Sequence, residues 1–412
     1  MPRILLCATT TGYQLTSFRE AAARLGYEVA LATDRCHVME DPWGDQAVAF
    51  RTGQIEGPVD GVVALGDRAT TFAAEAAQRL GLRFHPPPAV AAAQDKAAAR
   101  RLFRQAGLLA PQSQFVEAGA PGFPCVVKPV RRSGSQGVIR ADSPTEFERA
   151  VQRVRRLVGD EPILAEEFIP GREFALEGLV KDGMLHPLTI FDKPDPLDGP
   201  FFDETIYLTP SREPAGIQDQ IRSTVQRAAR ALGFTDGPIH AEMRVNAEGV
   251  WMLEAAARPI GGLCARVLPG LEEKILVHAV TGAIPAPFRE PAGVMMIPVP
   301  REGIYQGIRG LEEARSVPGI AEIEITAVRG QHLRPLPEGA SYFGFIFARG
   351  ALLRPLGAES VESGIETRAL LDRVEAALRE AHQRLQIEWT AVLPVLASPA
   401  SAEPFREEAG TV

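Results

Sequence analysis

The chain has 412 residues, of which 45% are hydrophobic and 23% charged, and its formal net charge is −8. A single core rarely grows past about 250–300 residues, so we expect two or three domains. The mild charge and the absence of a basic block argue against nucleic acid as the main partner. No run of about 20 apolar residues occurs, so we expect no membrane span.

Four cysteines, Cys7, Cys36, Cys125 and Cys264, lie far apart and form no CxxC pair. We therefore expect free, buried thiols in a reducing cytoplasm rather than a zinc site. The first run, MPRILLCATTTG, is predicted to be a strand and a turn rather than a signal peptide, because a polar helix-forming segment follows at once.

Residues 3–85 alternate between apolar runs and segments with helical spacing. The sequence predicts strands at RILLCATT, YEVALATD and VDGVVALGD, helices at SFREAAARLG and TTFAAEAAQRLG, and a strand-like stretch at LRFH. This order predicts a small parallel sheet with helices on both faces, and the loops Thr9–Gly12 and Gly66–Asp67 fall at its ligand-binding carboxyl edge. No GxGxxG follows the first strand, so this domain is interpreted as one wall of a substrate pocket rather than a dinucleotide site.

Two lysines lie in segments that predict regular structure. AVAAAQDKAAARRLFRQAGL predicts a helix that ends near Gly107 and places Lys96 and Arg100 on one face. FPCVVKPV predicts an apolar strand that contains one cation, Lys128. Because an unpaired buried charge is costly, Lys128 is expected to meet an anion.

The loop RRSGSQGV follows that strand directly. Gly134 and Gly137 let the backbone approach a ligand closely, while Ser133 and Ser135 add hydroxyl donors. Successive N–H groups in such a turn form a nest for anions, and a plain hairpin turn is the alternative interpretation. No GxxxxGK[ST] segment occurs, so this is not a Walker loop.

A helix and a further strand come next. SPTEFERAVQRVRRLVG predicts a capped helix, ILAEEFI predicts a strand, and the turn PGRE then carries Glu173. A carboxylate in that turn can accept hydrogen bonds from ribose hydroxyls, while backbone groups near Glu167 and Ile169 can face an adenine edge.

Two later glutamates are placed to hold a metal ion. Glu242 and Glu254 lie in strands that the turn NAEG joins as a hairpin, so their carboxylates are expected to face each other. Facing carboxylates repel unless a cation lies between them, and oxygen ligands suit Mg²⁺. Two separate solvated glutamates are the alternative, but both are flanked by apolar residues. Arg258 and Arg266 follow, and either guanidinium can neutralise a phosphate.

The C-terminal third predicts a distinct unit. VMMIPVP, AEIEITAV and YFGFIFARG are predicted strands, and SGIETRALLDRVEAALREAHQRLQ predicts a long amphipathic helix. Ahead of this unit, residues 191–211 form a Pro- and Asp-rich loop of the kind that often binds ligands. The last residues, SPASAEPFREEAGTV, are small and polar and are expected to be disordered.

Three of these segments, FPCVVKPVRRSGSQGV, LAEEFIPGREFALEGLV and HAEMRVNAEGVWMLEAAAR, resemble in their order the ATP-grasp superfamily. Within it, the chain resembles the L-amino acid ligases, a group that includes carnosine-synthase-like enzymes. The resemblance extends over residues 1–390 and implies an α/β fold with an α+β lid. It divides the chain into a Rossmann-like pre-ATP-grasp domain (1–90), an ATP-grasp domain (91–290, with a lid at about 111–168), a cap domain (291–396) and a disordered tail (397–412).

The resemblance also implies ATP as a ligand, with Mg²⁺ as the metal, two ions expected and Mn²⁺ as an alternative. Glu242 and Glu254 become the metal ligands, and Arg258 acts with Lys128 in catalysis at the phosphate and the developing tetrahedral centre. The implied ATP-binding residues are Lys96 and Lys128 at the phosphates, Ser133, Gly134, Ser135, Gly137 and Val138 in a closing loop, Glu166, Glu167, Phe168 and Ile169 at the adenine hinge, and Glu173 at the ribose.

In the resembling family the loop at 191–211 borders the amino acid pocket. Lys193 is therefore a candidate for a substrate carboxylate and Asp203 or Glu204 for an α-amino group, with a structural surface loop as the alternative. His240 is a candidate for substrate contact or for filling the strand core. Gly261, Gly262 and Arg266 complete the expected substrate contacts.

Two departures from the family pattern affect these expectations. Many ATP-grasp enzymes carry a metal-binding Asn two residues after the second glutamate, whereas this chain has Ala256 within EAAARPIGG. That form resembles the amino acid ligase branch and implies a metal shell completed by ATP oxygens and water. Arg131 and Arg132 add two cations ahead of the loop, and tighter ATP binding and recognition of an acidic substrate both remain open.

The implied reaction joins a carboxylate and an amine, with an amino acid as one substrate, through an acyl phosphate and with release of ADP and phosphate. The implied partners are small molecules, and a homodimer is a further option. A biotin-carboxylase-like activity and a non-catalytic nucleotide sensor are the alternatives. The missing Asn and the absence of a biotinyl AMKM segment count against the first, and the presence of both lysines, both glutamates and Arg258 counts against the second.

Overall fold

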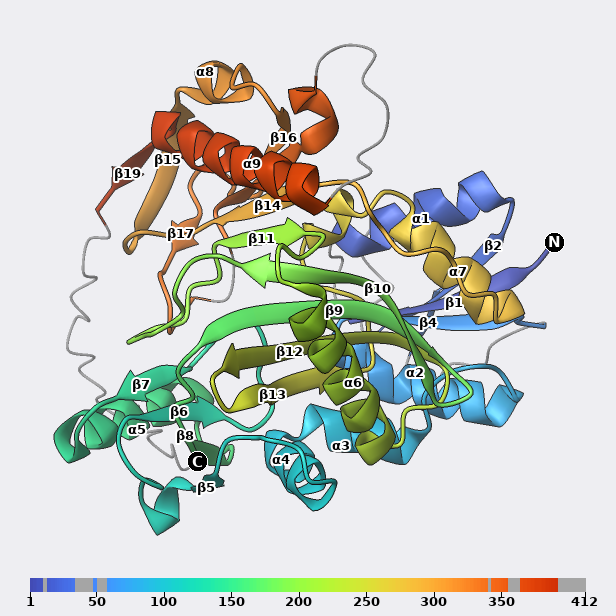
Figure 1. Ribbon diagram of the computed structural model, residues 1–412, viewed down its shortest axis with the longest axis horizontal. Coiled ribbons are helices and arrows are strands. Elements are labelled where there is room, and N and C mark those ends of the chain that lie inside the picture. Colours follow the sequence, from blue (N-terminus) through green and yellow to red (C-terminus); the bar gives the residue numbers. More distant parts are fainter. Residues whose placement is uncertain (10–12, 34–46, 50–57, 340–341, 355–363, 392–412) are drawn as a thin grey trace, which may run out of the picture.

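The computed structural model describes residues 1–9, 13–33, 47–49, 58–339, 342–354 and 364–391. These residues form an α/β structure with four sheets (Figure 1). No helix among them is long and apolar enough to cross a membrane. Cys36 and the predicted tail at 397–412 lie outside the described residues.

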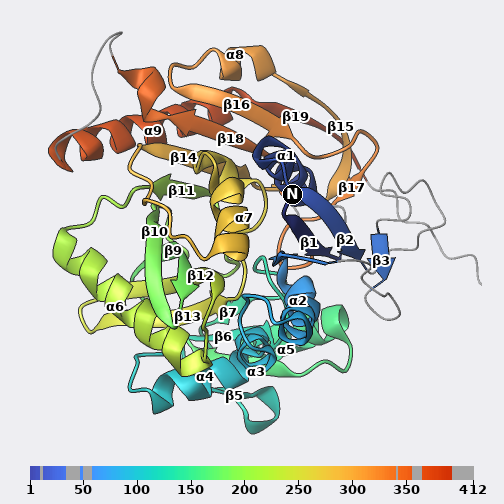
Figure 2. The ribbon, with the colours of Figure 1, turned by 90° about the vertical axis from the view of Figure 1, so that its right-hand side faces the viewer.

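The N-terminal sheet is parallel, as predicted, with strand order β3-β2-β1-β4. Helices α1 and α7 cover one of its faces and α2 covers the other (Figure 2). The strand predicted at LRFH is wrong, because residues 82–85 are irregular and the His85 ring stacks on Phe234 at 4.2 Å instead. The elements are β1 (Arg3–Ala8), α1 (Tyr13–Leu25), β2 (Glu28–Thr33), β3 (Ala47–Ala49), β4 (Gly61–Leu65), α2 (Asp67–Leu80) and α7 (Leu271–Thr281).

The single helix predicted over 89–108 is instead two, α3 (Pro87–Gln94) and α4 (Lys96–Gln105). Asp95 separates them in an extended conformation, and its carboxylate accepts a hydrogen bond from the Ala98 N–H. An Asp at this position caps the second helix, which stabilises the break. The break makes Lys96 the first residue of α4.

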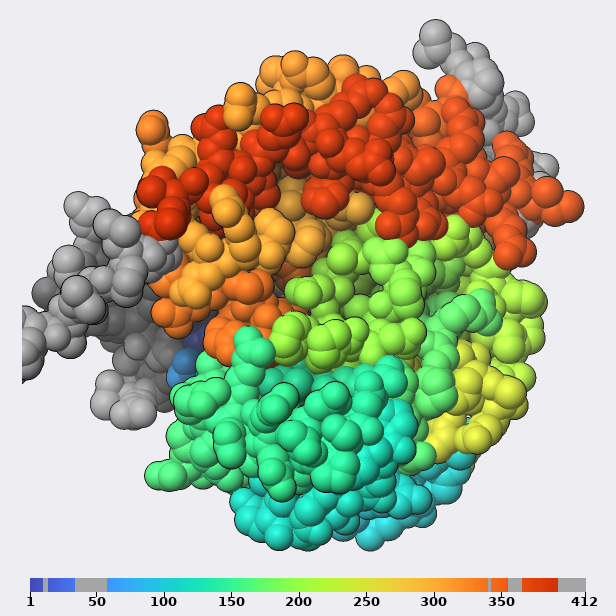
Figure 3. Space-filling view, turned by 90° about the vertical axis from the view of Figure 1, so that its left-hand side faces the viewer, coloured from blue at the N-terminus to red at the C-terminus, as the bar shows by residue number. Residues whose placement is uncertain are grey.

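Residues 111–168, predicted as the lid and called the lid below, contain a small antiparallel sheet of order β5-β8-β6-β7 with one helix, α5, packed on it. In Figure 3 the lid faces the viewer in teal and green, below a part of the C-terminal unit drawn in orange. As predicted, Ser143 caps α5 by accepting from the Glu146 N–H. The lid elements are β5 (Ser113–Phe115), β6 (Cys125–Pro129), β7 (Ile139–Ala141), α5 (Pro144–Val158) and β8 (Ile163–Glu167).

The central sheet has eight antiparallel strands in the order β13-β12-β9-β10-β11-β14-β18-β16. It runs without a break across the predicted domain boundary at 290, because Ile206 to Thr209 of β11 pair with Met295 to Ala292 of β14. Its strands are β9 (Arg172–Lys181), β10 (Met184–Lys193), β11 (Ile206–Thr209), β12 (Gly237–Asn246), β13 (Gly249–Ala256), β14 (Ala292–Ile297), β16 (Ile320–Ile325) and β18 (Gly344–Arg349).

Helix α6 packs on the half of this sheet that contains β9, β10 and β13, and α9 packs on the half that contains β11, β14 and β18 (Figure 1). A three-stranded sheet, β17-β15-β19, adjoins the C-terminal half. The remaining elements are α6 (Ala215–Leu232), β15 (Gly303–Arg309), α8 (Leu311–Arg315), β17 (His332–Leu333), α9 (Gly364–Arg384) and β19 (Gln386–Thr390).

The close packing of α9 on the sheet is testable at Gly293. A Cβ there would lie 2.7 Å from Leu208 Cδ2 and 2.9 Å from Val374 Cγ1. We expect Gly293→Val to lower the free energy of unfolding by about 1–3 kcal/mol through overpacking, measured by urea unfolding. Gly216→Ala, in the first turn of α6 where a Cβ meets nothing within 4 Å, should leave stability unchanged or slightly raised. A wild-type midpoint for Gly293→Val would contradict this packing.

Candidate active site

A cavity of about 560 Å³ lies between the lid, the hairpin β12–β13, the loop before β11 and the C-terminal strands. It brings together most of the residues that the sequence predicted for the site. Those in its wall are Lys96, Lys128, Ser133, Gly134, Ser135, Val138, Glu166, Glu167, Phe168, Ile169, Glu173, Glu204, His240, Glu242, Glu254, Arg258, Gly261 and Gly262.

Three predicted residues, Gly137, Lys193 and Arg266, lie outside this wall. Gly137 has a φ of +74°, and a Cβ there would lie 3.0 Å from Pro129 Cγ, so its role is to turn the loop. Arg266 faces a different surface, where its NH1 group donates to Glu322 at 2.7 Å. The predicted substrate contact of Arg266 is therefore not supported, because β16 supplies carboxylate partners for this guanidinium away from the cavity.

The two predicted phosphate lysines reach the cavity from different elements. Lys96, at the start of α4, donates to the Arg132 carbonyl at 2.6 Å. Lys128, on β6, is 9% exposed and forms an ion pair with Glu166. Burial lowers the pKa of Lys128 to about 8, although the attraction of Glu166 opposes that shift. The anion that the apolar strand called for is thus partly Glu166 itself.

Arg100 is a site residue that the sequence analysis placed beside Lys96 but assigned no role. Its side chain is fully buried, and its NH2 group lies 3.1 Å from Glu166 Oε2. Its NH1 group donates to the carbonyl of Leu253, the residue before Glu254. Burial alone would raise the pKa of Glu166, but Arg100 and Lys128 hold it below the ordinary value.

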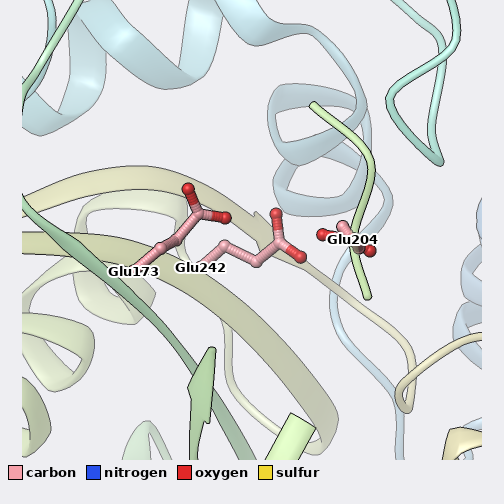
Figure 4. A group of neighbouring side chains, drawn as sticks. All are labelled: Glu173, Glu204 and Glu242. Atoms are coloured by element: carbon pink, nitrogen blue, oxygen red, sulfur yellow. The ribbon is translucent and has the colours of Figure 1, made fainter. Parts of the chain in front are cut away.

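Three carboxylates meet at the centre of the site. One oxygen each from Glu173, Glu204 and Glu242 lie within 4.8 Å of one another (Figure 4). Lys193 Nζ lies among them, 2.8 Å from Glu173, 2.7 Å from Glu204 and 3.1 Å from Glu242. Burial alone would lower the pKa of Lys193, but these carboxylates raise it well above the ordinary value.

The structure does not support the role predicted for Lys193, pairing with a substrate carboxylate. Its side chain is 3% exposed, and the three N–H donors of the ammonium already face three carboxylates. The sequence showed a lysine in a polar loop, but the structure ends strand β10 at this residue and buries it.

Arg244 is a second buried cation that the sequence analysis missed. Its Nε donates to Glu173 at 3.0 Å, and its NH1 group donates to the Ile169 carbonyl at 2.8 Å. Glu173 is thereby fixed between Lys193 and Arg244. The signal was present, because Arg244 is a single cation in the apolar strand MRV, the same pattern that singled out Lys128.

Glu242 and Glu254 are directly paired across β12 and β13, as predicted for the hairpin. Their side chains are 23% and 27% exposed, so both carboxylates reach the cavity. Glu254 lies 3.5 Å from Lys96 Nζ. Two neighbouring carboxylates beside a lysine that lines the cavity fit a Mg²⁺ ion shared with a polyphosphate. Ala256 adds no ligand atom to this set.

His240 and Glu177 lie directly behind Glu242. His240 Nδ1 is 3.1 Å from Glu177 Oε2, and its Nε2 is 3.5 Å from Glu242 Oε1. Burial alone would lower the pKa of His240, but hydrogen bonds with Glu177 and Glu242 raise it to about 9. Glu177 is fully buried and also accepts from the Ile260 N–H at 3.1 Å, so it fixes the turn that leads to Gly261.

Arg258 is held by the N-terminal unit. Its Nε donates to Asp67 Oδ1 at 2.6 Å and its NH2 group donates to Oδ2 at 3.0 Å. Asp67 begins α2, so the loop Gly66–Asp67 reaches the cavity as the sequence predicted for a ligand-binding edge. A bidentate pair of this kind fixes the plane of the guanidinium.

The far end of the cavity contains side chains that the sequence analysis did not assign. Tyr342 donates to Glu204 at 3.3 Å, and its ring meets that of Phe345 edge to face. The residues at this end come from separate loops and strands, so no local sequence motif identifies them. This end is lined by Gln14, Tyr207, Cys264, Met296, Tyr342 and Phe345. Cys264 is a free, buried thiol, as are Cys7 and Cys125, and this confirms the prediction for these three residues.

Replacing Lys193 tests the central ion cluster. Lys193→Met leaves three neighbouring carboxylates without their shared cation, so we expect the free energy of unfolding to fall by about 3–5 kcal/mol at neutral pH. Urea unfolding measures the loss. Lys181→Met, which removes a partly exposed lysine from β9, should change stability by less than about 0.5 kcal/mol. Equal effects of the two substitutions would contradict the cluster.

Residues 121–267 match the ATP-grasp domain family, and residues 295–354 match L-amino acid ligase C-terminal domain 2. A D-alanine–D-alanine ligase of Aromatoleum aromaticum is 34% identical over 116 residues, which are 27% of this chain and 36% of the relative. An alanine–anticapsin ligase of Bacillus subtilis is 28% identical over 220 residues, 46% of each protein. The chain thus spans less than half the length of these two relatives.

The overall structure is similar to the crystal structure of an L-amino acid ligase from Bacillus licheniformis. The TM-score is 0.74 at 27% identity, and the match covers 95% of this chain and 99% of the other. The α/β fold and the resemblance inferred from the three sequence segments are both confirmed. The chain thus contains an ATP-grasp domain and, after it, a C-terminal domain of the L-amino acid ligase type.

Proposed function

We propose that this protein is an ATP-dependent carboxylate–amine ligase that joins an amino acid to another amino acid or a small carboxylate. The observation that carries the proposal is one cavity in which Lys96 and Lys128 lie beside the paired Glu242 and Glu254, next to an end lined by tyrosines. The relatives described above are amino acid ligases by name, which supports the same chemistry. The C-terminal match to amino acid ligases disfavours a carboxylase.

ATP would lie between the lid and the hairpin β12–β13. Lys96, Lys128 and the backbone of residues 133–138 would bind the phosphates, and residues 166–169 would face the base. Glu173, oriented by Lys193 and Arg244, would accept from the ribose hydroxyls. Mg²⁺, as two ions and with Mn²⁺ as a substitute, would be held by Glu242 and Glu254 and would neutralise phosphate charge.

The reaction proceeds in two steps. The substrate carboxylate attacks the γ-phosphorus, so that ADP leaves and an acyl phosphate forms. The amine then attacks the acyl carbon, and phosphate leaves as the amide forms. Arg258, held by Asp67, and Lys128 contribute by positioning the phosphate and offsetting its charge. Closure of the lid excludes water, which would otherwise hydrolyse the acyl phosphate.

We keep the lid at about 111–168 and the cap at 291–396 as proposed domains, and the sheet β5-β8-β6-β7 with α5 supports the first. A homodimer and a cytoplasmic location remain predictions.

The proposal is tested by measuring ADP, AMP and phosphate release with Mg²⁺-ATP across pairs of amino acids and small carboxylates. We expect ADP release that depends on the pair, together with an amide product detected by mass spectrometry. AMP release would refute the acyl-phosphate route. ADP release that needs only bicarbonate would favour the carboxylase. Turnover that no substrate pair raises above background would favour a nucleotide sensor.

Substitution of Glu254 tests the metal assignment. We expect Glu254→Gln to lower the rate of ADP formation at least about 100-fold. A neutral amide binds Mg²⁺ less well than a carboxylate, and the metal is what would neutralise the phosphate charge. The matched control is Glu248→Gln, in the exposed turn of the same hairpin, which should retain the wild-type rate. Normal turnover by Glu254→Gln would remove this residue from the metal site.

The depressed pKa of Lys128 predicts proton uptake on nucleotide binding. With a pKa of about 8, Lys128 is mostly neutral at pH 9 and mostly charged at pH 7. Phosphate raises the pKa of a neighbouring ammonium, so binding at pH 9 should take up protons that are already present at pH 7. Calorimetry in two buffers of different ionisation enthalpy measures this uptake, and Lys128→Met should abolish it. Equal uptake by both proteins at pH 9 would assign the protons to another group.

A further inference from the structure

A short loop of the C-terminal unit, residues 334–339, projects onto the lid. Its sequence is RPLPEG, and Pro335 and Pro337 restrict the backbone. Gly339 donates its N–H to the Pro335 carbonyl at 2.9 Å, and a Cβ at Gly339 would lie 2.1 Å from the Arg334 carbonyl oxygen. Only glycine therefore fits this turn, and the loop has a fixed conformation that projects onto the lid.

The projection carries Glu338, which binds the lid helix. Arg153 of α5 donates to both carboxylate oxygens of Glu338, with its Nε at 2.6 Å and its NH2 group at 2.8 Å. The side chains are 38% and 34% exposed. The hydrogen bond from Arg153 holds the pKa of Glu338 below its ordinary value, so the pair is ionised at neutral pH. The other face of Arg153 covers the Phe201 ring at 4.9 Å.

The same projection holds the glycine loop that follows β6. Gln136 Nε2 donates to the Glu338 carbonyl at 3.2 Å, and the Gly137 N–H donates to the Pro337 carbonyl at 3.0 Å. These two residues come directly after Ser135, which lines the cavity at the phosphate end. The C-terminal unit thus contacts both the helix of the lid and the loop that would cover the phosphates.

The C-terminal unit also lines the opposite end of the cavity. Tyr342 lies three residues after Gly339 and donates to Glu204 at 3.3 Å. One unit therefore contacts the proposed substrate end and the lid that closes over ATP. A lid held from that side stays closed while the acyl phosphate is present, and a lid released from it admits water.

We propose that Glu338 is a positioning residue through which the C-terminal unit holds the glycine loop over the nucleotide and keeps ATP cleavage coupled to amide formation. This inference rests on the proposed ligase function. Glu338 does not line the cavity, so its carboxylate acts through Arg153 rather than by contact with the substrate, and it thereby fixes the backbone that accepts from Gln136 and Gly137.

The test compares Glu338→Ala, Arg153→Ala and the exchanged pair Arg153→Glu with Glu338→Arg. The readouts are the ratio of ADP to amide released and the dissociation rate of a fluorescent ATP analogue in stopped flow. We expect each single substitution to raise both quantities about two- to fivefold, as loss of a partly exposed ion pair allows. The exchanged pair, which restores the ion pair in reverse, should recover most of the wild-type ratio.

Arg155→Ala is the matched control. Arg155 is on the same helix and equally exposed at 37%, but its NH1 group donates to the Gly159 and Glu161 carbonyls within the lid. It should leave both readouts unchanged. Effects as large for Arg155→Ala as for Arg153→Ala, or a wild-type ratio in Glu338→Ala, would overturn the proposal.

The two readouts separate this inference from the proposed function. If the wild-type protein forms no amide with any substrate pair, the ligase function fails, and the coupling role of Glu338 fails with it. Faster analogue release from Glu338→Ala alone would then show that the contact holds the lid. If the wild-type protein forms amide but Glu338→Ala changes neither readout, the function stands and the role of Glu338 is wrong.

Discussion

Lys193 places one positive charge among three carboxylates, and the centre of the cavity depends on that arrangement. Without the ammonium, Glu173, Glu204 and Glu242 would repel one another at their separation of less than 4.8 Å. Glu173 is in β9, Glu204 is in the loop before β11 and Glu242 is in β12. One cation therefore joins three separate parts of the central sheet. The second oxygens of Glu173 and Glu204 accept from Arg244 and Tyr342, so both carboxylates are fixed by donors on two sides.

The buried cations of the site fall into two groups. Lys193, Arg100 and Arg244 bind carboxylates and backbone carbonyls of the protein itself. Lys96 and Lys128 line the cavity, where Lys96 contacts the Arg132 carbonyl and Glu254, and Lys128 pairs with Glu166. The first group fixes the acidic side chains and the second offers charge to a ligand. A site that handles a highly charged nucleotide in a poorly solvated cavity needs both functions.

Much of the fold and part of the site could be predicted from local pattern. The alternating N-terminal elements, the lid strand around Lys128 and the hairpin of Glu242 and Glu254 follow from periodicity and turn residues over short distances. The break at Asp95 could not be predicted, because the sequence alone does not distinguish an Asp that caps a new helix from an Asp within one continuous helix. The contacts of Lys193 and Arg266 could not be predicted for a related reason. Their partners lie on elements more than ten residues away, and pairing at that distance depends on tertiary packing.

The continuous central sheet has a consequence for dividing this protein. The predicted ATP-grasp domain ends at residue 290, yet β11 within it pairs along its full length with β14 beyond it. A chain ended at that boundary would leave the N–H and C=O groups of β11 that face β14 unpaired at a new sheet edge, beside the apolar side chains of Ile206 and Leu208. Unprotected edges of this kind recruit other strands, so such a fragment is prone to self-association. The parts of the chain before and after residue 290 therefore share one sheet, and we do not expect the first part to stay soluble without the second.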